Sequence, residues 1–168
     1  MRKAAPAVGH NQFLVFHIDS EEFGADVLSV VRVLPYDTLE TLPDAPEFVE
    51  GLLPLQPSSL PVIDLGKRFG GSHKSAGPAA RILVVEAKGT RLGILVDSVQ
   101  EVLAVPDSDL ADPPGFINDS AANVLHCVAD LGDRLILILD LTRILSSEEI
   151  AEVAAMEPGR SPTDEVVE

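Results

Sequence analysis

Two aspartates stand at matching places in the chain, where each could take part in acid–base chemistry. Asp64 and Asp140 both end short apolar runs. Two carboxylates that share one proton perform the chemistry of an aspartic hydrolase. That chemistry needs each Asp on a tight turn, usually followed by Thr or Ser and then Gly, whereas bulky Leu65 and Leu141 follow here. The sequence therefore favours aspartates that end strands and accept backbone N–H bonds, with a two-lobed aspartic hydrolase as the remote alternative.

The histidines and the single cysteine give no sign of a metal centre, which needs three or four converging ligands. No two histidines stand at ligand spacing among His10, His17, His73 and His126. His126 and Cys127 are neighbours in an apparent strand, so we expect opposite faces for them and a small buried hydrophobe at Cys127. No phosphate-binding loop or nucleophile elbow is present. We predict no catalytic residue, metal or cofactor, and a protein that is not an enzyme.

The composition narrows the remaining function classes. The 168 residues carry 12 Lys and Arg against 27 Asp and Glu, a formal net charge of −15. This charge disfavours nucleic-acid binding and docking on an anionic membrane, since both need basic surface. One Cys excludes an intramolecular disulfide, and we find neither a signal peptide nor a membrane-spanning run. We expect a cytoplasmic protein that works through its surface.

An internal repeat indicates the architecture. Residues 13–34 align without a gap on 82–103, and residues 48–69 align on 124–145. These alignments superpose Gly24 on Gly93 and Val62 on Ile138. The apolar runs are short, β-branched and bounded by turn residues, which predicts strands. Because no long helix separates them, we expect antiparallel pairing in an all-β fold of two similar small barrels packed together.

The chain also contains a helix signal near its end. Ser146 and Glu149 form a capping box, which predicts a helix over 146–156. Short helical turns are expected at 27–31 and, in the second copy, at 96–99. The predicted organisation is a flexible N-terminus (1–11), a domain of two intertwined barrels (12–156, with halves 12–69 and 81–145) and a flexible acidic tail (157–168).

Several ordered motifs match a known family. They are FLVFHIDSEEFGADVLSVVRVL (13–34), FVEG (48–51), LPVIDLGKRFG (60–70), LGILVDSVQEVL (92–103) and LGDRLILILDLTRIL (131–145). Together they resemble a CheW-type domain over roughly residues 12–156. The resemblance implies two pseudo-symmetric SH3-like five-stranded β-barrels, in agreement with the repeat.

The resemblance also implies a role and partners. CheW-type proteins are adaptors that link chemoreceptors to the histidine kinase CheA, whose regulatory domain has the same fold. One rigid body that holds two partners raises the effective concentration of kinase at receptor. The family implies no cofactor, no nucleic acid and no direct membrane insertion, and a cytoplasmic location at the inner face of the membrane through receptor arrays.

The resemblance assigns contact residues as well. Kinase contacts are expected at Val30 and Gly51, with exposed apolar strand ends of the second barrel making a further contact. Receptor contacts are expected in a groove between the barrels, near Val27, Arg32, Gln56 and Ile82. Ordinary core packing is the competing interpretation for Val27, Val30 and Ile82.

One hairpin departs from the family pattern, which usually reads Gly-x-x-Asn-Leu-Arg-Gly before PVIDL. Here Gln56 replaces the Arg, removing a charge and its donor fork, and Pro57 replaces the final Gly. Arg32 stands where relatives often carry Glu. The alternative function is therefore an accessory CheW-like protein that binds kinase but has altered or absent receptor binding.

Overall fold

The structure is a computed structural model that describes residues 11–41, 43–55, 59–68, 77–113 and 124–155. Apart from Asn11, the predicted flexible ends (1–11 and 157–168) lie outside these residues. The strands are β1 (Gln12–Ile18), β2 (Glu21–Asp26), β3 (Val30–Pro35), β4 (Val49–Leu53), β5 (Leu60–Asp64), β6 (Arg81–Ala87), β7 (Thr90–Val96), β8 (Ser98–Ala104), β9 (Leu110–Ala111), β10 (Leu125–Asp130) and β11 (Leu135–Leu139). The helices are η1 (Val27–Ser29), α1 (Leu65–Arg68), η2 (Asp107–Asp109), η3 (Leu141–Arg143) and α3 (Ser147–Ala155).

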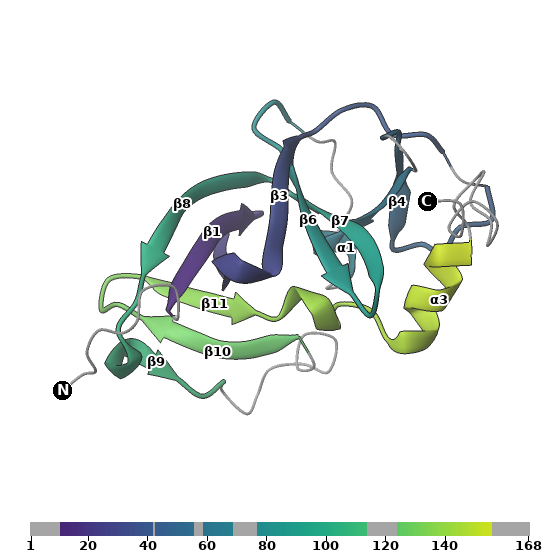
Figure 1. The fold of residues 1–168 in the computed structure, drawn as a ribbon. Coiled ribbons are helices and arrows are strands. Elements are labelled where there is room, and N and C mark those ends of the chain that lie inside the picture. The colour runs from purple at the N-terminus through teal and green to yellow at the C-terminus, as the bar shows by residue number, and fades with distance from the viewer. Residues whose placement is uncertain (1–10, 42, 56–58, 69–76, 114–123, 156–168) are drawn as a thin grey trace.

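The strands form two sheets, which confirms the predicted all-β fold (Figure 1). The six-stranded lobe has the order β8-β1-β2-β11-β10-β9, and its last strand is only two residues long. The five-stranded lobe has the order β3-β6-β7-β5-β4. The chain crosses between the lobes twice within the described residues, at η1 and at Asp97.

Each lobe contains strands from both halves of the repeat. In the six-stranded lobe, β1 and β2 of the first half lie beside β8 to β11 of the second. In the five-stranded lobe, β6 and β7 of the second half lie between β3 and β5 of the first. The two halves are therefore woven into each other, and each completes the sheet of the other.

Two strand pairs are parallel, which corrects the expectation of purely antiparallel pairing. β11 pairs in parallel with β2, and β5 pairs in parallel with β7. A parallel pair needs a long crossover connection, usually a helix. Here the polypeptide of the other lobe supplies much of the crossover between β2 and β11, so a helix is not required.

The repeat is visible in the packing of its two aligned glycines. Gly24 on β2 lies opposite Ile138 on β11, and Gly93 on β7 lies opposite Val62 on β5. A Cβ on Gly93 would meet Leu60 Cδ2 at 3.0 Å and Val62 Cγ2 at 3.2 Å, and a Cβ on Gly24 would meet Ile138 Cδ1 at 2.9 Å. Both glycines therefore permit close packing against a strand from the other half.

The largest hydrophobic cluster draws on both lobes. It contains Phe16 and Phe23 of the six-stranded lobe, whose rings stack with centroids 6.1 Å apart. It also contains Ile63 and Ile94 of the five-stranded lobe, and both are fully buried. A core shared in this way holds the lobes together as one packed body.

The predicted helical turns differ between the two copies. η1 forms at the first, where the Asp26 carboxylate accepts the Leu28 N–H at 2.9 Å. The second copy lacks a helix, because the chain passes from β7 through Asp97 directly into β8. The Asp97 carboxylate accepts the Asp19 N–H at 2.6 Å instead and ties the crossing to the β1–β2 turn.

Helix α3 has the predicted capping box. Ser146 Oγ accepts the Glu149 N–H at 3.1 Å, and Glu149 Oε1 accepts the Ser146 N–H at 2.8 Å. Ile150 and Val153 are buried against the main cluster. The Arg68 guanidinium fastens this end by donating to Glu149 at 2.7 Å and to the Ile144 carbonyl at 3.0 Å.

A charged cluster joins β2, β8 and the β10–β11 turn of the six-stranded lobe. Arg134 donates to both carboxylate oxygens of Glu22, at 3.1 and 2.9 Å, and to Glu101 on β8 at 3.1 Å. The hydrogen bonds from Arg134 lower the pKa of Glu22 below its ordinary value of 4.5, against the opposing effect of burial. A lowered folded-state pKa means that the ionised carboxylate stabilises the fold.

We expect this cluster to make the folding stability of the protein depend on pH. Because the folded-state pKa of Glu22 lies below the unfolded value, its contribution is fully present above about pH 4.5 and is lost as the pH falls through the lowered pKa. Urea unfolding should show wild type more stable than Glu22→Gln near neutral pH, with the difference shrinking toward about pH 3. Glu21→Gln, an exposed neighbour, is the control. A constant difference between wild type and Glu22→Gln across this range contradicts the prediction.

Candidate interaction surface

Large apolar side chains are exposed along η1 and the edge strand β3. Leu28 is 77% exposed, and Val31 and Val33 are 44% and 42% exposed. On β8, the edge strand of the six-stranded lobe, Val102 is 51% exposed. Exposed apolar side chains that group along an edge strand mark a surface suited to binding another protein. We call Leu28, Val31 and Val33, which lie along η1 and β3, the apolar edge.

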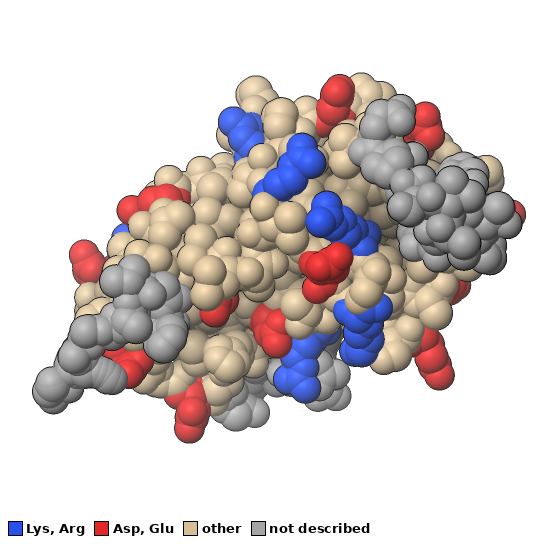
Figure 2. Space-filling view, viewed as in Figure 1, with Lys and Arg blue, Asp and Glu red and all other residues tan. Residues whose placement is uncertain are grey.

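Basic side chains gather on the same face. Figure 2 shows several of them over the region of β3, β6 and β7, with acidic side chains between them. Arg32 on β3 is exposed, as are Lys88 and Arg91 at the β6–β7 turn. Arg91 contacts Glu86 at 3.7 Å, an exposed ion pair of small energetic value. This face therefore combines apolar and positive groups in a protein of strongly negative net charge.

The predicted site residues Val27 and Val30 are both half-buried. Val27 begins η1, and Val30 begins β3, where it packs against the main cluster. Val99, its partner in the repeat, packs against the same cluster. Part of each predicted side chain is thus open to a partner, while Val30 also serves the core.

Ile82 differs, because it is fully buried on β6. It packs in the second hydrophobic cluster with Val62 and Leu95, and Leu34 of β3 is its strand neighbour. The core-packing interpretation therefore holds for Ile82. A fully buried side chain cannot contact a partner directly, so any effect of Ile82 on a binding surface must pass through β3, the strand beside it.

Gly51 is buried on β4 beneath the preceding loop. Leu52 and Glu40 form an isolated bridge with N–H to O distances of 2.7 and 2.9 Å. A Cβ on Gly51 would lie 2.7 Å from the Glu40 carbonyl oxygen and 3.0 Å from Leu39 Cβ. The absence of a side chain at Gly51 therefore lets this loop lie on β4.

The altered hairpin lies partly outside the described residues. Gln56 and Pro57 both belong to the stretch that the structure does not describe. Pro54 is exposed and follows directly after β4, which is an edge strand of its sheet. A proline without an N–H donor is tolerated at such an edge.

The two aspartates proposed for hydrolysis end strands in different lobes. Asp64 Oδ1 accepts the Lys67 N–H at 3.2 Å at the start of α1. Asp140 Oδ1 accepts the Thr142 N–H at 3.1 Å and its hydroxyl at 2.6 Å at the start of η3. These are the turn contacts that the structural interpretation predicted, and they give the carboxylates a role in the fold.

His126 and Cys127 correct one expectation. The register of β10 against β11 shifts between Leu125 and Cys127, so His126 is the extra residue of a β-bulge. Both side chains line one cavity rather than facing opposite sides. Cys127 is half-buried and packs against an apolar cluster. Within the described residues, no three His, Cys, Asp or Glu side chains are arranged to hold a metal ion.

Sequence reasoning did not single out the apolar edge. The run VVRVLP (30–35) has apolar residues on both faces of a strand, a pattern that also fits complete burial. A bulge between Val30 and Arg32 shifts the register as well. The one available signal was the break in this run at Arg32, which a strand buried on both faces does not accommodate.

Comparison with known proteins identifies the family. The CheW-like domain family model matches residues 12–149, which includes every described strand and the beginning of α3. The chain is 31% identical over 150 residues to the chemotaxis protein CheW of Klebsiella aerogenes, covering 89% of this chain and 90% of that protein. It is 28% identical over 159 residues to CheW of Treponema pallidum, covering 91% and 94%.

A solved structure agrees with these relatives. The scaffolding protein TtCheW from Thermoanaerobacter tengcongensis superposes with a TM-score of 0.75 at 29% sequence identity. The superposition covers 83% of this chain and 94% of that one. Sequence motifs, fold and relatives thus agree, and the chain belongs to the CheW-like domain family.

Proposed function

We propose that this protein is a non-catalytic adaptor that couples chemoreceptors to a CheA-type histidine kinase. The observation that carries the proposal is membership of the CheW-like family over residues 12–149. Relatives named as chemotaxis proteins and a structural neighbour named as a scaffolding protein support the same role. An adaptor needs two binding surfaces on one rigid body, and the shared core between the lobes provides that rigidity.

The kinase regulatory domain is proposed to bind the five-stranded lobe around Val30 and Gly51. Val30 leaves part of its side chain open at the start of β3. Gly51 is buried, so its contribution is to hold the Leu39–Glu40 loop in place on β4. The kinase then contacts the loop and strand ends that Gly51 positions.

The receptor is proposed to bind along the apolar edge. A receptor's helical tip needs apolar contacts at turn-spaced positions. Val27 and Arg32 lie on or beside this surface, and Ile82 lies on β6, the strand that pairs with β3. Gln56 is included in the proposal by the resemblance alone. Across the described residues, no helix is long and apolar enough to span a bilayer. We place the protein in the cytoplasm, brought to the membrane by its receptor.

Two charges placed on the apolar edge are expected to weaken receptor binding. In the double variant Leu28→Asp/Val33→Asp, affinity for a receptor cytoplasmic tip should fall at least about tenfold, because apolar contacts are replaced by carboxylates that binding would bury. Leu135→Asp is the matched control, since Leu135 is a 58% exposed apolar residue outside the surface. Binding is measured by calorimetry. Equal losses in both variants, or no interaction of wild type with a CheA-type regulatory domain at tens of micromolar, would contradict the proposal.

The departure at Gln56 and Pro57 favours a second function, an accessory adaptor that binds kinase with altered or absent receptor binding. The Arg of the family provides a charged guanidinium group with several N–H donors, which Gln lacks. The variant Gln56→Arg/Pro57→Gly separates the two functions. A gain in receptor affinity at unchanged kinase affinity supports the accessory function, and unchanged receptor affinity supports the ordinary adaptor.

A further inference from the structure

Arg32 lies within the apolar edge. It is exposed on β3, between the exposed side chains of Val31 and Val33. Across the part of the chain that the structure describes, its guanidinium group makes neither a hydrogen bond nor an ion pair. A partner that binds the apolar edge must therefore accommodate a positive charge that the protein itself does not neutralise.

The acidic residue on the neighbouring strand does not neutralise this charge. Arg32 pairs with Val84 of β6, and Glu86 lies two residues further along β6, on the same face of the sheet as Val84. Glu86 contacts Arg91 on β7 at 3.7 Å instead. The guanidinium group of Arg32 thus stays available to a carboxylate from outside the chain.

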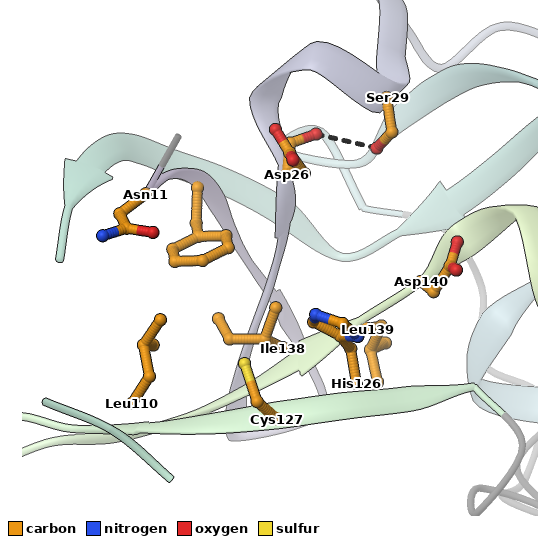
Figure 3. A pocket seen from close by; sticks show the side chains of 10 residues that line it. Asn11, Asp26, Ser29, Leu110, His126, Cys127, Ile138, Leu139 and Asp140 are labelled. Atoms are coloured by element: carbon orange, nitrogen blue, oxygen red, sulfur yellow. Dashed lines mark hydrogen bonds between the residues drawn. The ribbon is translucent and has the colours of Figure 1, made fainter. Parts of the chain in front are cut away.

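The turn that carries Leu28, at one end of the apolar edge, is held by local hydrogen bonds. The Asp26 carboxylate accepts the Leu28 N–H at 2.9 Å. The Ser29 hydroxyl donates to the Asp26 carbonyl oxygen at 2.7 Å, as Figure 3 shows. A partner that binds an already ordered side chain pays less conformational entropy. Leu28 therefore suits the role of an apolar anchor beside the charge of Arg32.

The backbone of β3 disfavours a partner that adds a further strand to the sheet. Within the described residues β3 pairs with β6 alone, so its other side is open. However, the register shifts between Val30 and Arg32, and the last residue of the strand is Pro35, which has no N–H donor. Bulges and prolines protect an edge strand from pairing. A partner is therefore recognised through side chains, as an amphipathic helix is.

The position of Arg32 determines the chemistry that such a helix needs. A partner that covers Val31 and Val33 also removes water from Arg32. A guanidinium group buried without an acceptor is strongly unfavourable, whereas a carboxylate can accept two parallel N–H bonds from it. The net charge of −15 repels a helix that is acidic throughout. The surface therefore fits an apolar stripe with a single carboxylate placed beside it.

We propose that Arg32 determines receptor specificity by pairing with a Glu or Asp beside the apolar stripe of the receptor helix. A helix with Lys or Arg at that place meets a like charge and is rejected. This inference rests on the proposed binding of a receptor to the apolar edge, and it adds the chemistry by which the receptor is recognised.

The test uses two synthetic amphipathic helical peptides of about five turns. Both carry Leu at positions i, i+3, i+4 and i+7. One has Glu at the two positions that flank this stripe in its middle turn, and the other has Gln there. In titrations of the full-length protein, the Glu peptide should bind about tenfold more tightly and shift the backbone amide NMR signals of Leu28, Val31 and Val33. Equal affinities, shifts that map elsewhere, or no binding up to about 1 mM overturn the proposal.

Variants then test Arg32 itself. Arg32→Gln should bind the Glu and Gln peptides equally, because the charge pair is lost. Arg32→Glu should prefer a third peptide, with Lys at the two flanking positions, about tenfold over the Glu peptide. Arg91→Gln is the matched control, since Arg91 is an exposed arginine that already contacts Glu86. A preference for the Glu peptide retained in Arg32→Gln, or lost equally in Arg91→Gln, overturns the assignment.

Two further measurements separate the ways in which the proposal can fail. Wild-type protein that binds a CheA-type regulatory domain but does not prefer the Glu peptide overturns the role of Arg32 and leaves the adaptor function intact. Protein that binds neither the regulatory domain nor the peptides overturns both. Amide shifts at Val31 and Val33 that change with the concentration of the free protein would assign the apolar edge to a second copy of the chain instead.

Discussion

Replacing Gly93 with alanine is expected to destabilise the protein by about 2–3 kcal/mol, measured by urea unfolding. The new Cβ would lie 2.7 Å from Ile82 Cγ2, 3.0 Å from Leu60 Cδ2 and 3.2 Å from Val62 Cγ2. All three neighbours are buried, and the branched methyls of Ile82 and Val62 are held close to the backbone. The strand pair β5–β7 must therefore separate to admit the methyl group.

Gly24→Ala is the matched control for Gly93→Ala, because the repeat aligns the two positions. Its nearest contact is Ile138 Cδ1 at 2.9 Å, the end of a side chain that can rotate away. We expect a clearly smaller cost there. The double variant Gly93→Ala/Ile82→Ala should be less destabilised than the sum of its single changes, since each relieves the other. Additive effects would contradict the packing account.

Replacing Gly51 with alanine is expected to cost about 2 kcal/mol and to weaken kinase binding. The added Cβ would lie 2.7 Å from the Glu40 carbonyl oxygen, and backbone atoms cannot rotate away as a side chain can. The loop at Leu39 and Glu40 must therefore leave β4. Hydrogen exchange at the Leu52 amide, which donates to Glu40 at 2.9 Å, should accelerate as the bridge opens.

Gly77→Ala is the control for this change, because nothing lies within 4 Å of a Cβ there. Its stability should stay within about 0.5 kcal/mol of wild type. Kinase affinity unchanged in Gly51→Ala, alongside fast exchange at Leu52, would show that the loop is not part of the kinase surface. Slow exchange at Leu52 would contradict the structural role of Gly51 itself.

The strands and the repeat could be predicted from local sequence, but their partners could not. The short apolar runs and the turn residues that bound them indicate where β2 and β11 lie along the chain. Their parallel pairing joins residues more than 100 positions apart, such as Gly24 and Ile138, and no local pattern encodes it. The helix at Ser147–Ala155 was predicted within one residue because its capping box is entirely local.

The two copies of the repeat also adopt different local structures where one of them makes a contact with a distant part of the chain. Val27–Ser29 forms η1 because Asp26 caps it, whereas Asp97 in the second copy accepts a hydrogen bond from the β1–β2 turn. The same limit applies to the candidate sites. The bulge at His126 and the burial of Ile82 depend on neighbouring strands, so resemblance could name the residues without indicating which are accessible.

The woven order of the strands has a consequence for synthesis. The β1–β2 hairpin leaves the ribosome first, but its neighbours β11 and β8 belong to the second half of the chain. About 70 residues separate the end of β2 from the start of β8. At a synthesis rate of 5–20 residues per second, roughly 4–14 s pass between the completion of the hairpin and the synthesis of β8. The five-stranded lobe, continuous from 30 to 96, can close during that time. The nascent six-stranded lobe meanwhile presents two unpaired edges, which makes it the stage of biogenesis most in need of a chaperone.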